Sequence, residues 1–230
     1  MTGADRKAAA GPPKLTGFTL ALNYLPLGLI LLGLAIFLVL PSAGWQAAFV
    51  LFWLYLFPPL VCRAVLALYG RPYGRGLDQH ARAYKVWWFL TQLQVIFSRI
   101  PWLEEVLRLI PGAYAAWLNL WGSRVSLFAY WGPGARVVDR YLVEVERGAV
   151  IGNGSAMTGH LGTLTPDGSY SLDVAPATVE AGAILGANSG LGPGCRVGPN
   201  ELLPAGRLLQ PFSQWVGGRK IKERDEEEAA

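Results

Sequence analysis

The chain has 230 residues, 52% of them hydrophobic and nine of them Trp, which is a high content for a soluble protein, so we expect a membrane segment. Its two cysteines, Cys62 and Cys195, make neither a disulfide framework nor a zinc site. Residues 1–135 carry eleven Lys or Arg against four Asp or Glu, and residues 136–230 carry nine against twelve. A basic, apolar half suits an anionic membrane leaflet, and no nucleic-acid recognition motif occurs.

The first segments predict an arm and then a membrane hairpin. Residues 1–17 are polar and are expected to be a disordered arm. Residues 18–40 contain no charge and are long enough to cross a bilayer as a helix. A signal peptide is the alternative, but the run is long for one and leads directly into a second apolar run from Trp45.

The second apolar run contains Pro58-Pro59, so we expect it to be bent and to extend to Tyr69. Residues 18–70 therefore predict a transmembrane helical hairpin. The connecting turn has no Lys or Arg whereas both ends do, which predicts an integral membrane protein, of the bacterial inner membrane, with both termini in the cytoplasm.

Residues 71–131 begin with a breaker-rich connector, residues 71–76, and continue as helix-like pieces separated by Pro101 and Pro111-Gly112. Charged residues interrupt each piece, and Trp and Tyr are frequent. We interpret these pieces as amphipathic helices lying in the membrane surface. A soluble helical collar packed on the following domain is the alternative.

Apolar residues then recur at every sixth position, with glycine one or three places after most of them. This period fits neither a helix nor an ordinary strand, but fits short strands joined by tight turns, and it predicts a parallel β-helix over residues 132–210. The in-phase residues supply about three coils of three hexapeptides. A charged tail, residues 211–230, follows. The in-phase residues are Val145, Ile151, Met157, Val179, Leu185, Leu191, Val197 and Leu203.

The hexapeptides at residues 151–156, 185–190 and 191–196 resemble those of the hexapeptide-repeat acyltransferases. This resemblance implies a left-handed β-helix, a homotrimer, and an acyl group supplied by coenzyme A or acyl carrier protein. The fold class expected is therefore α+β: a transmembrane hairpin and interfacial helices, followed by a short left-handed parallel β-helix.

The repeat is interrupted after Met157, where residues 161–172 contain the turn signal Pro166-Asp167-Gly168. His160 lies at this break, and insertions in a regular solenoid often carry function. A neutral imidazole can take the proton of an attacking hydroxyl or amine at cellular pH, so His160 is the candidate general base. The resemblance agrees, because a histidine beside a loop between coils has this role in that family. A surface histidine in a turn is the alternative.

A carboxylate bonded to the other ring nitrogen would fix the tautomer of His160. The nearest acids in sequence are Asp139, Glu144 and Glu146, and Glu144 is favoured because its distance of 16 residues is close to an 18-residue coil. Asn153 is a second candidate partner, although a turn residue is the simpler interpretation.

The resemblance also implies a donor groove between subunits, for which Ser189, Gly190 and Gly192 are candidates. Trimer formation is favoured because so short a β-helix buries little core alone. No metal is expected, since the repeat domain has a single histidine and a catalytic zinc usually needs three ligands.

Two functions are compatible with the sequence. The first is a membrane-bound acyltransferase that acts on a lipid, glycolipid or other amphipathic acceptor. The second is a non-enzymatic β-helix scaffold of a membrane biosynthetic complex.

Overall fold

The computed structural model describes residues 16–164 and 170–222. Most of the expected arm at residues 1–17, the turn signal at residues 166–168 and the end of the charged tail at residues 211–230 therefore lie outside the described residues.

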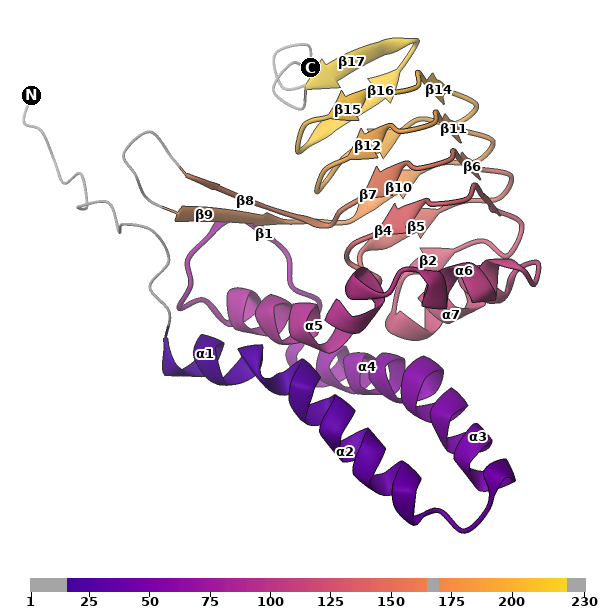
Figure 1. Cartoon of the computed structure of the whole chain (residues 1–230). Coiled ribbons are helices and arrows are strands. Elements are labelled where there is room, and N and C mark those ends of the chain that lie inside the picture. Colours follow the sequence, from indigo (N-terminus) through magenta and orange to yellow (C-terminus); the bar gives the residue numbers. More distant parts are fainter. Residues whose placement is uncertain (1–15, 165–169, 223–230) are drawn as a thin grey trace, which may run out of the picture.

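Two long apolar helical rods form a hairpin at the N-terminal side of the molecule (Figure 1). They span Gly17–Val39 and Ala43–Tyr69, and by length and composition each could cross a bilayer. The first rod consists of α1 (Gly17–Asn23) and α2 (Leu25–Val39), and the second of α3 (Ala43–Leu51), the π-helical turn η1 (Phe52–Leu56) and α4 (Phe57–Tyr69).

The predicted bend of the second rod takes the form of the π-helical turn. Pro58 and Pro59 have no N–H to donate to the preceding turn, and the Phe57 N–H bonds to the carbonyl of Phe52, five residues back. The rod ends at Gly70, whose φ of +81° favours glycine.

Three further helices lie between the hairpin and the strands: α5 (Arg82–Arg99), α6 (Trp102–Arg108) and α7 (Ala113–Trp121). They were expected to lie in a membrane surface, but Trp87, Phe97, Trp117 and Trp121 are all at least 96% buried in the protein. Helix α7 packs against strand β2 (Arg124–Val125) and α4, and α5 packs against α2 and α4, so these helices form a collar between the hairpin and the strands, while their position in a membrane surface stays a prediction. Trp102 remains 61% exposed.

The remaining strands wind into a parallel β-helix with three faces (Figure 1). The sheets have the orders β17-β16-β13-β10-β5-β2, β14-β11-β6-β3 and β15-β12-β7-β4. The in-phase residues predicted from the sequence are all buried, which confirms the interpretation of the six-residue period. The left-handed sense stays a prediction. The strands are β2 (Arg124–Val125), β3 (Tyr130–Trp131), β4 (Arg136–Val137), β5 (Val143–Val145), β6 (Val150–Ile151), β7 (Ala156–Met157), β10 (Ala177–Val179), β11 (Ile184–Leu185), β12 (Gly190–Leu191), β13 (Arg196–Val197), β14 (Leu202–Leu203), β15 (Leu208–Leu209), β16 (Ser213–Val216) and β17 (Arg219–Lys222).

The β-helix is longer at both ends than the expected residues 132–210. Val125 and Trp131 line the interior of an additional first coil, and Trp215 lies in β16 above the last one. The antiparallel strand β17 then pairs with β16 and covers its edge, which blocks further parallel stacking.

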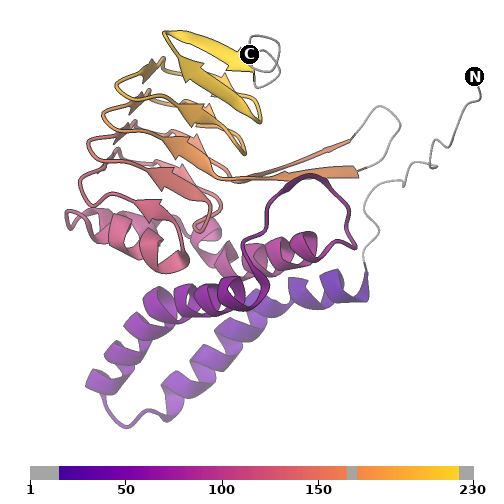
Figure 2. The ribbon, with the colours of Figure 1, turned by 180° about the vertical axis from the view of Figure 1, so that it is seen from behind.

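A three-stranded antiparallel arm leaves the side of the β-helix where the repeat is interrupted (Figures 1 and 2). It consists of β8 (His160–Leu164), β9 (Tyr170–Val174) and β1 (Gly74–Leu77), and β1 comes from the segment expected to be only a connector. The arm thus connects the helical half to the β-helix.

Candidate active site

His160 and Asp139 lie on neighbouring coils at the same corner of the β-helix. His160 follows β7 and Asp139 follows β4, and Val137 pairs with Met157 in the register of these two strands. Gly159 permits the close approach, because a Cβ there would lie 2.6 Å from the Cβ of Leu142 and 3.2 Å from that of Asp139. The fold therefore brings the imidazole next to the carboxylate.

The carboxylate of Asp139 is fully buried and is held by several donors. His160 Nδ1 lies 2.7 Å from Oδ2 and 2.9 Å from Oδ1 of Asp139, and the Gly159 N–H donates to Oδ2 at 2.8 Å. The Thr158 hydroxyl donates to the His160 carbonyl at 2.9 Å. A neutral His160 that donates from Nδ1 keeps its lone pair on Nε2, which is the form a general base needs.

The environment of His160 acts on its pKa in opposite directions. Burial lowers the pKa, while the charge of Asp139 and its hydrogen bond raise it, and the net pKa is higher than the ordinary 6.5. The ring of Trp87 packs against the imidazole edge to face, with 4.9 Å between centroids. The side chain of His160 is still 22% exposed, and its Nε2 has no hydrogen-bond partner among the described residues. The imidazole is therefore partly open to its surroundings.

A buried ionic network holds the loop that carries Asp139. Arg140 is 98% buried, its Nε donates to Glu104 Oε1 at 2.6 Å, and its backbone N–H donates to Gln94 Oε1 at 3.0 Å. Burial raises the pKa of Tyr114, which stays neutral and donates to Glu104 Oε2 at 2.7 Å. Helices α5, α6 and α7 thus fix the residue next to Asp139.

The other candidates for the neighbourhood of His160 lie elsewhere, and Glu146 accepts the Ala181 N–H at 3.0 Å. Glu144 is on β5, where its carboxylate is 3.8 Å from Arg71 and 3.6 Å from Arg124. Asn153 is at the preceding corner, between β6 and β7, where its carbonyl accepts the Asn188 N–H at 2.8 Å. The structure brings none of them together with the imidazole.

The candidate donor-binding residues lie on the coil above. Ser189 is buried, and its hydroxyl donates to the Gly186 carbonyl at 2.5 Å, so this side chain is part of the interior. Gly190 pairs with Ala156, which places it within the third sheet. Gly192 is the nearest of the three to the His160 corner, because the Thr158 N–H bonds to the carbonyl directly before it.

Sequence reasoning named Asp139 only as one of three nearby acids, although a signal for it exists. Val137 and Val145 are eight residues apart where the period requires six, so two extra residues enlarge this corner. The spacing from Met157 to Val179 is also irregular. The corner after Val137 and the corner after Met157 stack on each other, which brings Asp139 next to His160. Among residues 16–164 and 170–222, no three His, Cys, Asp or Glu side chains gather as a metal site would require.

No family model and no curated protein matches the chain. Solved structures are similar at low identity. A hexapeptide-repeat acetyltransferase from Vibrio cholerae complexed with acetyl coenzyme A is 12% identical, with a TM-score of 0.36 over 56% of this chain and 86% of that one. Serine acetyltransferase from Neisseria gonorrhoeae is 18% identical, with a TM-score of 0.21 over 90% and 79%. Serine acetyltransferase isoform 3 from Entamoeba histolytica, in complex with cysteine, is 12% identical, with a TM-score of 0.22 over 98% and 92%. These values concern fold only and leave the chemistry to be argued from the site itself.

Proposed function

We propose that this protein is a membrane-bound acyltransferase in which His160 is the general base. The observation that carries the proposal is the pairing of His160 Nδ1 with the fully buried carboxylate of Asp139, while Nε2 has no hydrogen-bond partner among the described residues. A buried carboxylate that fixes the tautomer and stabilises the imidazolium is the arrangement that proton transfer from a nucleophile requires.

The reaction proposed is attack of an acceptor hydroxyl or amine on a thioester. Nε2 of His160 takes the proton from the nucleophile as its oxygen or nitrogen forms a bond to the thioester carbonyl carbon. The C–S bond then breaks, and the imidazolium returns the proton to the leaving thiolate. Asp139 accepts a hydrogen bond throughout and stabilises the positive ring. The products are the acylated acceptor and a free thiol.

The acyl donor is proposed to be acyl-coenzyme A or acyl carrier protein. Gly190 and Gly192 lie on the coil next to the His160 corner, and Gly192 shares that corner. The backbone N–H groups of Gly190 and Gly192 already donate to the carbonyls of Arg207 and Leu209 within the coils, so the support for these two residues is their place beside the His160 corner. Ser189 is the weaker candidate, since its hydroxyl and its backbone groups are all bonded inside the β-helix.

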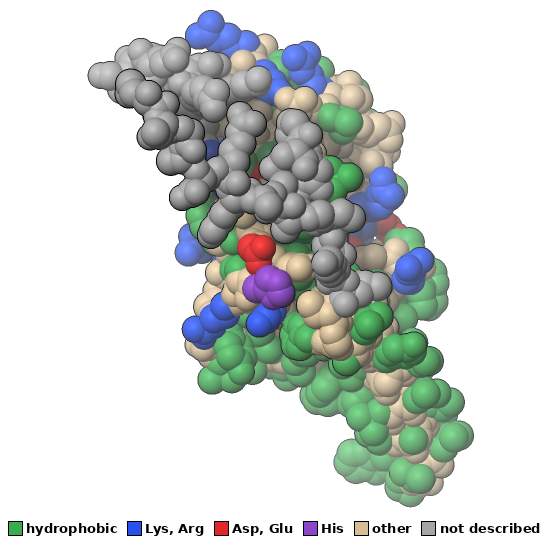
Figure 3. Space-filling model, turned by 90° about the vertical axis from the view of Figure 1, so that its left-hand side faces the viewer, with side chains coloured by type: hydrophobic (Ala, Val, Ile, Leu, Met, Phe, Trp, Pro, Cys, Tyr) green, Lys and Arg blue, Asp and Glu red, His purple; other side chains and the backbone are tan. Residues whose placement is uncertain are grey.

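A membrane-borne acceptor is favoured by the helical half. No Asp, Glu, Lys or Arg occurs between residues 18 and 62. Hydrophobic side chains cover the projecting end of the molecule, whereas the Lys and Arg side chains visible on that side lie away from this end (Figure 3). This distribution supports an integral membrane protein, proposed for the bacterial inner membrane with both termini cytoplasmic. The acceptor proposed is a lipid, glycolipid or other amphipathic molecule.

A homotrimer is supported by an apolar stripe on the outer face of one sheet. Tyr130, Val150, Ile184 and Leu202 are direct neighbours in the register of β3, β6, β11 and β14. Tyr130, Ile184 and Leu202 are 61%, 40% and 57% exposed. A continuous apolar stripe on a short solenoid is typical of a subunit interface.

The test is acyl transfer by the full chain in lipid nanodiscs. Labelled acetyl- and palmitoyl-coenzyme A would be incubated with the protein and a lipid extract, and products would be identified by mass spectrometry. We expect a labelled lipid from the wild type and from His80→Ala, the matched removal of the other histidine, which is exposed. His160→Ala should lower the rate by roughly 10²- to 10⁴-fold.

Equal rates for His160→Ala and the wild type would refute the role of the base. No turnover and no thioester binding by a well-folded wild-type chain would refute the acyltransferase and leave the scaffold function.

A further inference from the structure

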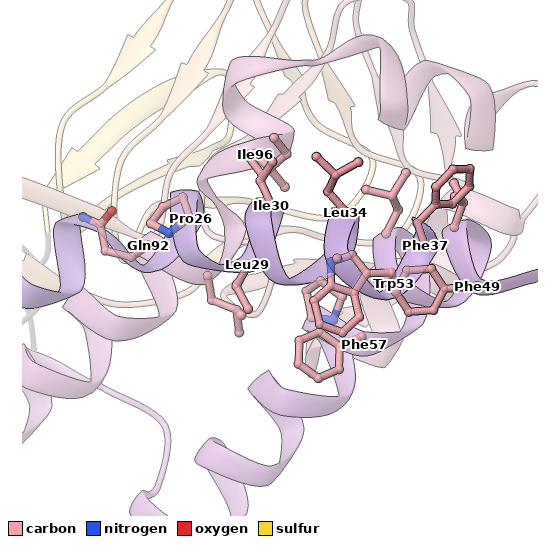
Figure 4. A pocket seen from close by; sticks show the side chains of 15 residues that line it. Pro26, Leu29, Ile30, Leu34, Phe37, Phe49, Trp53, Phe57, Gln92 and Ile96 are labelled. Carbon is pink, nitrogen blue, oxygen red and sulfur yellow. The ribbon is translucent and has the colours of Figure 1, made fainter. Parts of the chain in front are cut away.

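A cavity of about 370 Å³ lies between α2, the rod formed by α3, η1 and α4, and the collar helix α5 (Figure 4). It is more than twice the size of an engineered cavity of about 150 Å³ that binds benzene. Its walls on α2 run from Pro26 to Phe37, which corresponds to about 16 Å along a helix. Half of the ~30 Å hydrocarbon core of a bilayer has this thickness, so the cavity has the length of one acyl chain in one leaflet.

The cavity has a polar end and an apolar end. Gln92 and Pro26 lie at one end, and Phe37 and Phe49 lie at the other (Figure 4). The Gln92 amide donates to Asn23 Oδ1 at 3.3 Å, which places two amides together at the first end. The lining between these ends is apolar apart from the indole N–H of Trp53. Such a gradient matches a molecule with a polar head and a hydrocarbon tail.

A rigid aromatic wall keeps the cavity from collapsing. Phe49, Trp53 and Phe57 stack in succession, with centroid distances of 5.4 and 4.4 Å, and the π-helical turn lies between the first and last of them. Gly33 lets α2 approach this wall, because a Cβ there would lie 2.5 Å from Trp53 Nε1. The rings therefore cannot turn freely into the space that they border.

An acyl chain is the occupant that the surroundings favour. The space is open on one side, where Ile30 and Leu34 are 50% and 51% exposed, and without an occupant its apolar lining forfeits dispersion contacts. In a bilayer the hydrophobic effect gives no preference between protein and lipid tails, so the selection must come from fit and from the polar end.

The collar helix α5 links this cavity to the candidate active site. Gln92 lies at its polar end, and Trp87, five residues earlier on α5, packs on His160. At 3.6 residues per turn these two side chains point to nearly opposite sides of the helix, whose diameter is about 10 Å. A head group that starts at Gln92 must therefore extend past one helix to reach His160.

We infer that this cavity binds an acyl chain of the amphipathic acceptor, with the head group extending more than about 10 Å from Gln92 past α5 to His160. The assignment of the chain to the acceptor rests on the proposed function, whereas binding of a chain in the cavity does not. The acceptor class that follows is a lipid with an elongated polar head.

The test is photo-crosslinking of the full chain in nanodiscs of phosphatidylethanolamine and phosphatidylglycerol. The probe is a phospholipid whose palmitoyl chain carries a diazirine near its methyl end, and labelled peptides are located by mass spectrometry. The variants are Leu34→Trp, which fills the cavity, and Leu31→Trp, the matched control one turn away on the same helix. Leu34 lines the cavity and Leu31 does not, and they are 51% and 57% exposed.

We expect label to concentrate near Phe37 and Phe49 in the wild type and in Leu31→Trp. In Leu34→Trp it should fall about tenfold, or ~1.4 kcal/mol. Label spread evenly over the outer face of α2 in the wild type would overturn the cavity site, and this readout stands even if Leu34→Trp does not fold. Equal labelling of two folded variants would overturn it as well.

Transfer kinetics separate this inference from the proposed function. Leu34→Trp should raise the KM for the lipid acceptor about tenfold and leave the KM for the thioester unchanged, while His160→Ala should keep full labelling. Localised label in a chain that transfers no acyl group would overturn the assignment to an acceptor and the proposed function, but not the chain site. Transfer with evenly spread label would overturn the chain site and keep the function.

Discussion

Replacement of Asp139 by Asn tests the candidate site most directly, because it changes hydrogen-bonding character and little else. The buried carboxylate accepts from the Gly159 N–H at 2.8 Å and from His160 Nδ1 at 2.7 Å. In Asp139→Asn the amide oxygen can still accept from Gly159, and the amide nitrogen then donates to Nδ1. This forces the proton of His160 onto Nε2, which is the wrong tautomer for a base that acts through Nε2.

The size of the effect has an upper bound in what the base itself supplies, about 10² to 10⁴ in rate. The corresponding change in the serine protease triad lowers kcat by about 10⁴. We expect kcat/KM of Asp139→Asn to fall to within about tenfold of His160→Ala, a loss of roughly 3–5 kcal/mol of transition-state stabilisation. Glu144→Gln, which also removes a carboxylate but one paired with Arg71 and Arg124, should keep the wild-type rate.

The assay is thiol release from acyl-coenzyme A in nanodiscs as a function of pH. The neutral imidazole is the active form, so kcat/KM should rise with pH through the pKa of His160, which lies above 6.5. In Asp139→Asn the contributions that raise this pKa are lost and the lowering by burial remains, so the acid limb should move to lower pH. An unshifted limb, or a rate within about threefold of the wild type, would refute the assigned role of Asp139.

Three further predictions concern stability, measured as unfolding temperature in nanodiscs. The pKa of His160 is raised in the folded state, so its ion pair with Asp139 should stabilise the fold fully below pH 6.5. This contribution should be lost as the pH rises through the raised pKa, and His160→Ala should abolish this pH dependence of the unfolding temperature. Glu104→Gln should lower the free energy of unfolding by about 3–5 kcal/mol, because its arginine partners stay buried. Glu105→Gln should lower it by less than about 1 kcal/mol, because the Glu105 side chain is 40% exposed. Equal effects of the two changes would contradict the buried network. Gly206→Ala should cost about 1–2 kcal/mol, because its φ is +70° and the added Cβ would meet no atom. Gly154→Ala should destabilise more, because its φ is +65° and the added Cβ would also lie 2.4 Å from an asparagine oxygen of the next coil.

The β-helix could be predicted from the sequence because its period is local. Each in-phase residue, such as Ile151 or Leu185, fills the same interior whatever the rest of the chain does. The first coil was missed because Trp131 carries a large ring where the repeat usually has an aliphatic residue, although Val125, Trp131 and Val137 keep the spacing of six. The packing of the collar helices depends on surfaces distant in sequence, which periodicity does not reveal.

The histidine of the candidate site could be predicted from the sequence, but its carboxylate partner could not. An 18-residue coil favoured Glu144, but the two extra residues after Val137 lengthen this coil to 20 residues between the paired Val137 and Met157. The partner of His160 is consequently Asp139, which is 21 residues away. A residue count predicts which side chains stack on neighbouring coils only where the apolar residues between them keep the six-residue period.

The way α5 packs favours the proposed function over a simple tether. One face of this helix contacts His160 through Trp87 and the loop of Asp139 through Gln94. Its other face supplies Gln92 and Ile96 to the hairpin cavity. A tether would require only a flexible connection between hairpin and β-helix, and burial of a shared helix on both faces would add nothing to it. A helix shared in this way fixes the distance between a chain in the membrane and the imidazole above it, which is what a transferase acting on a lipid head group needs.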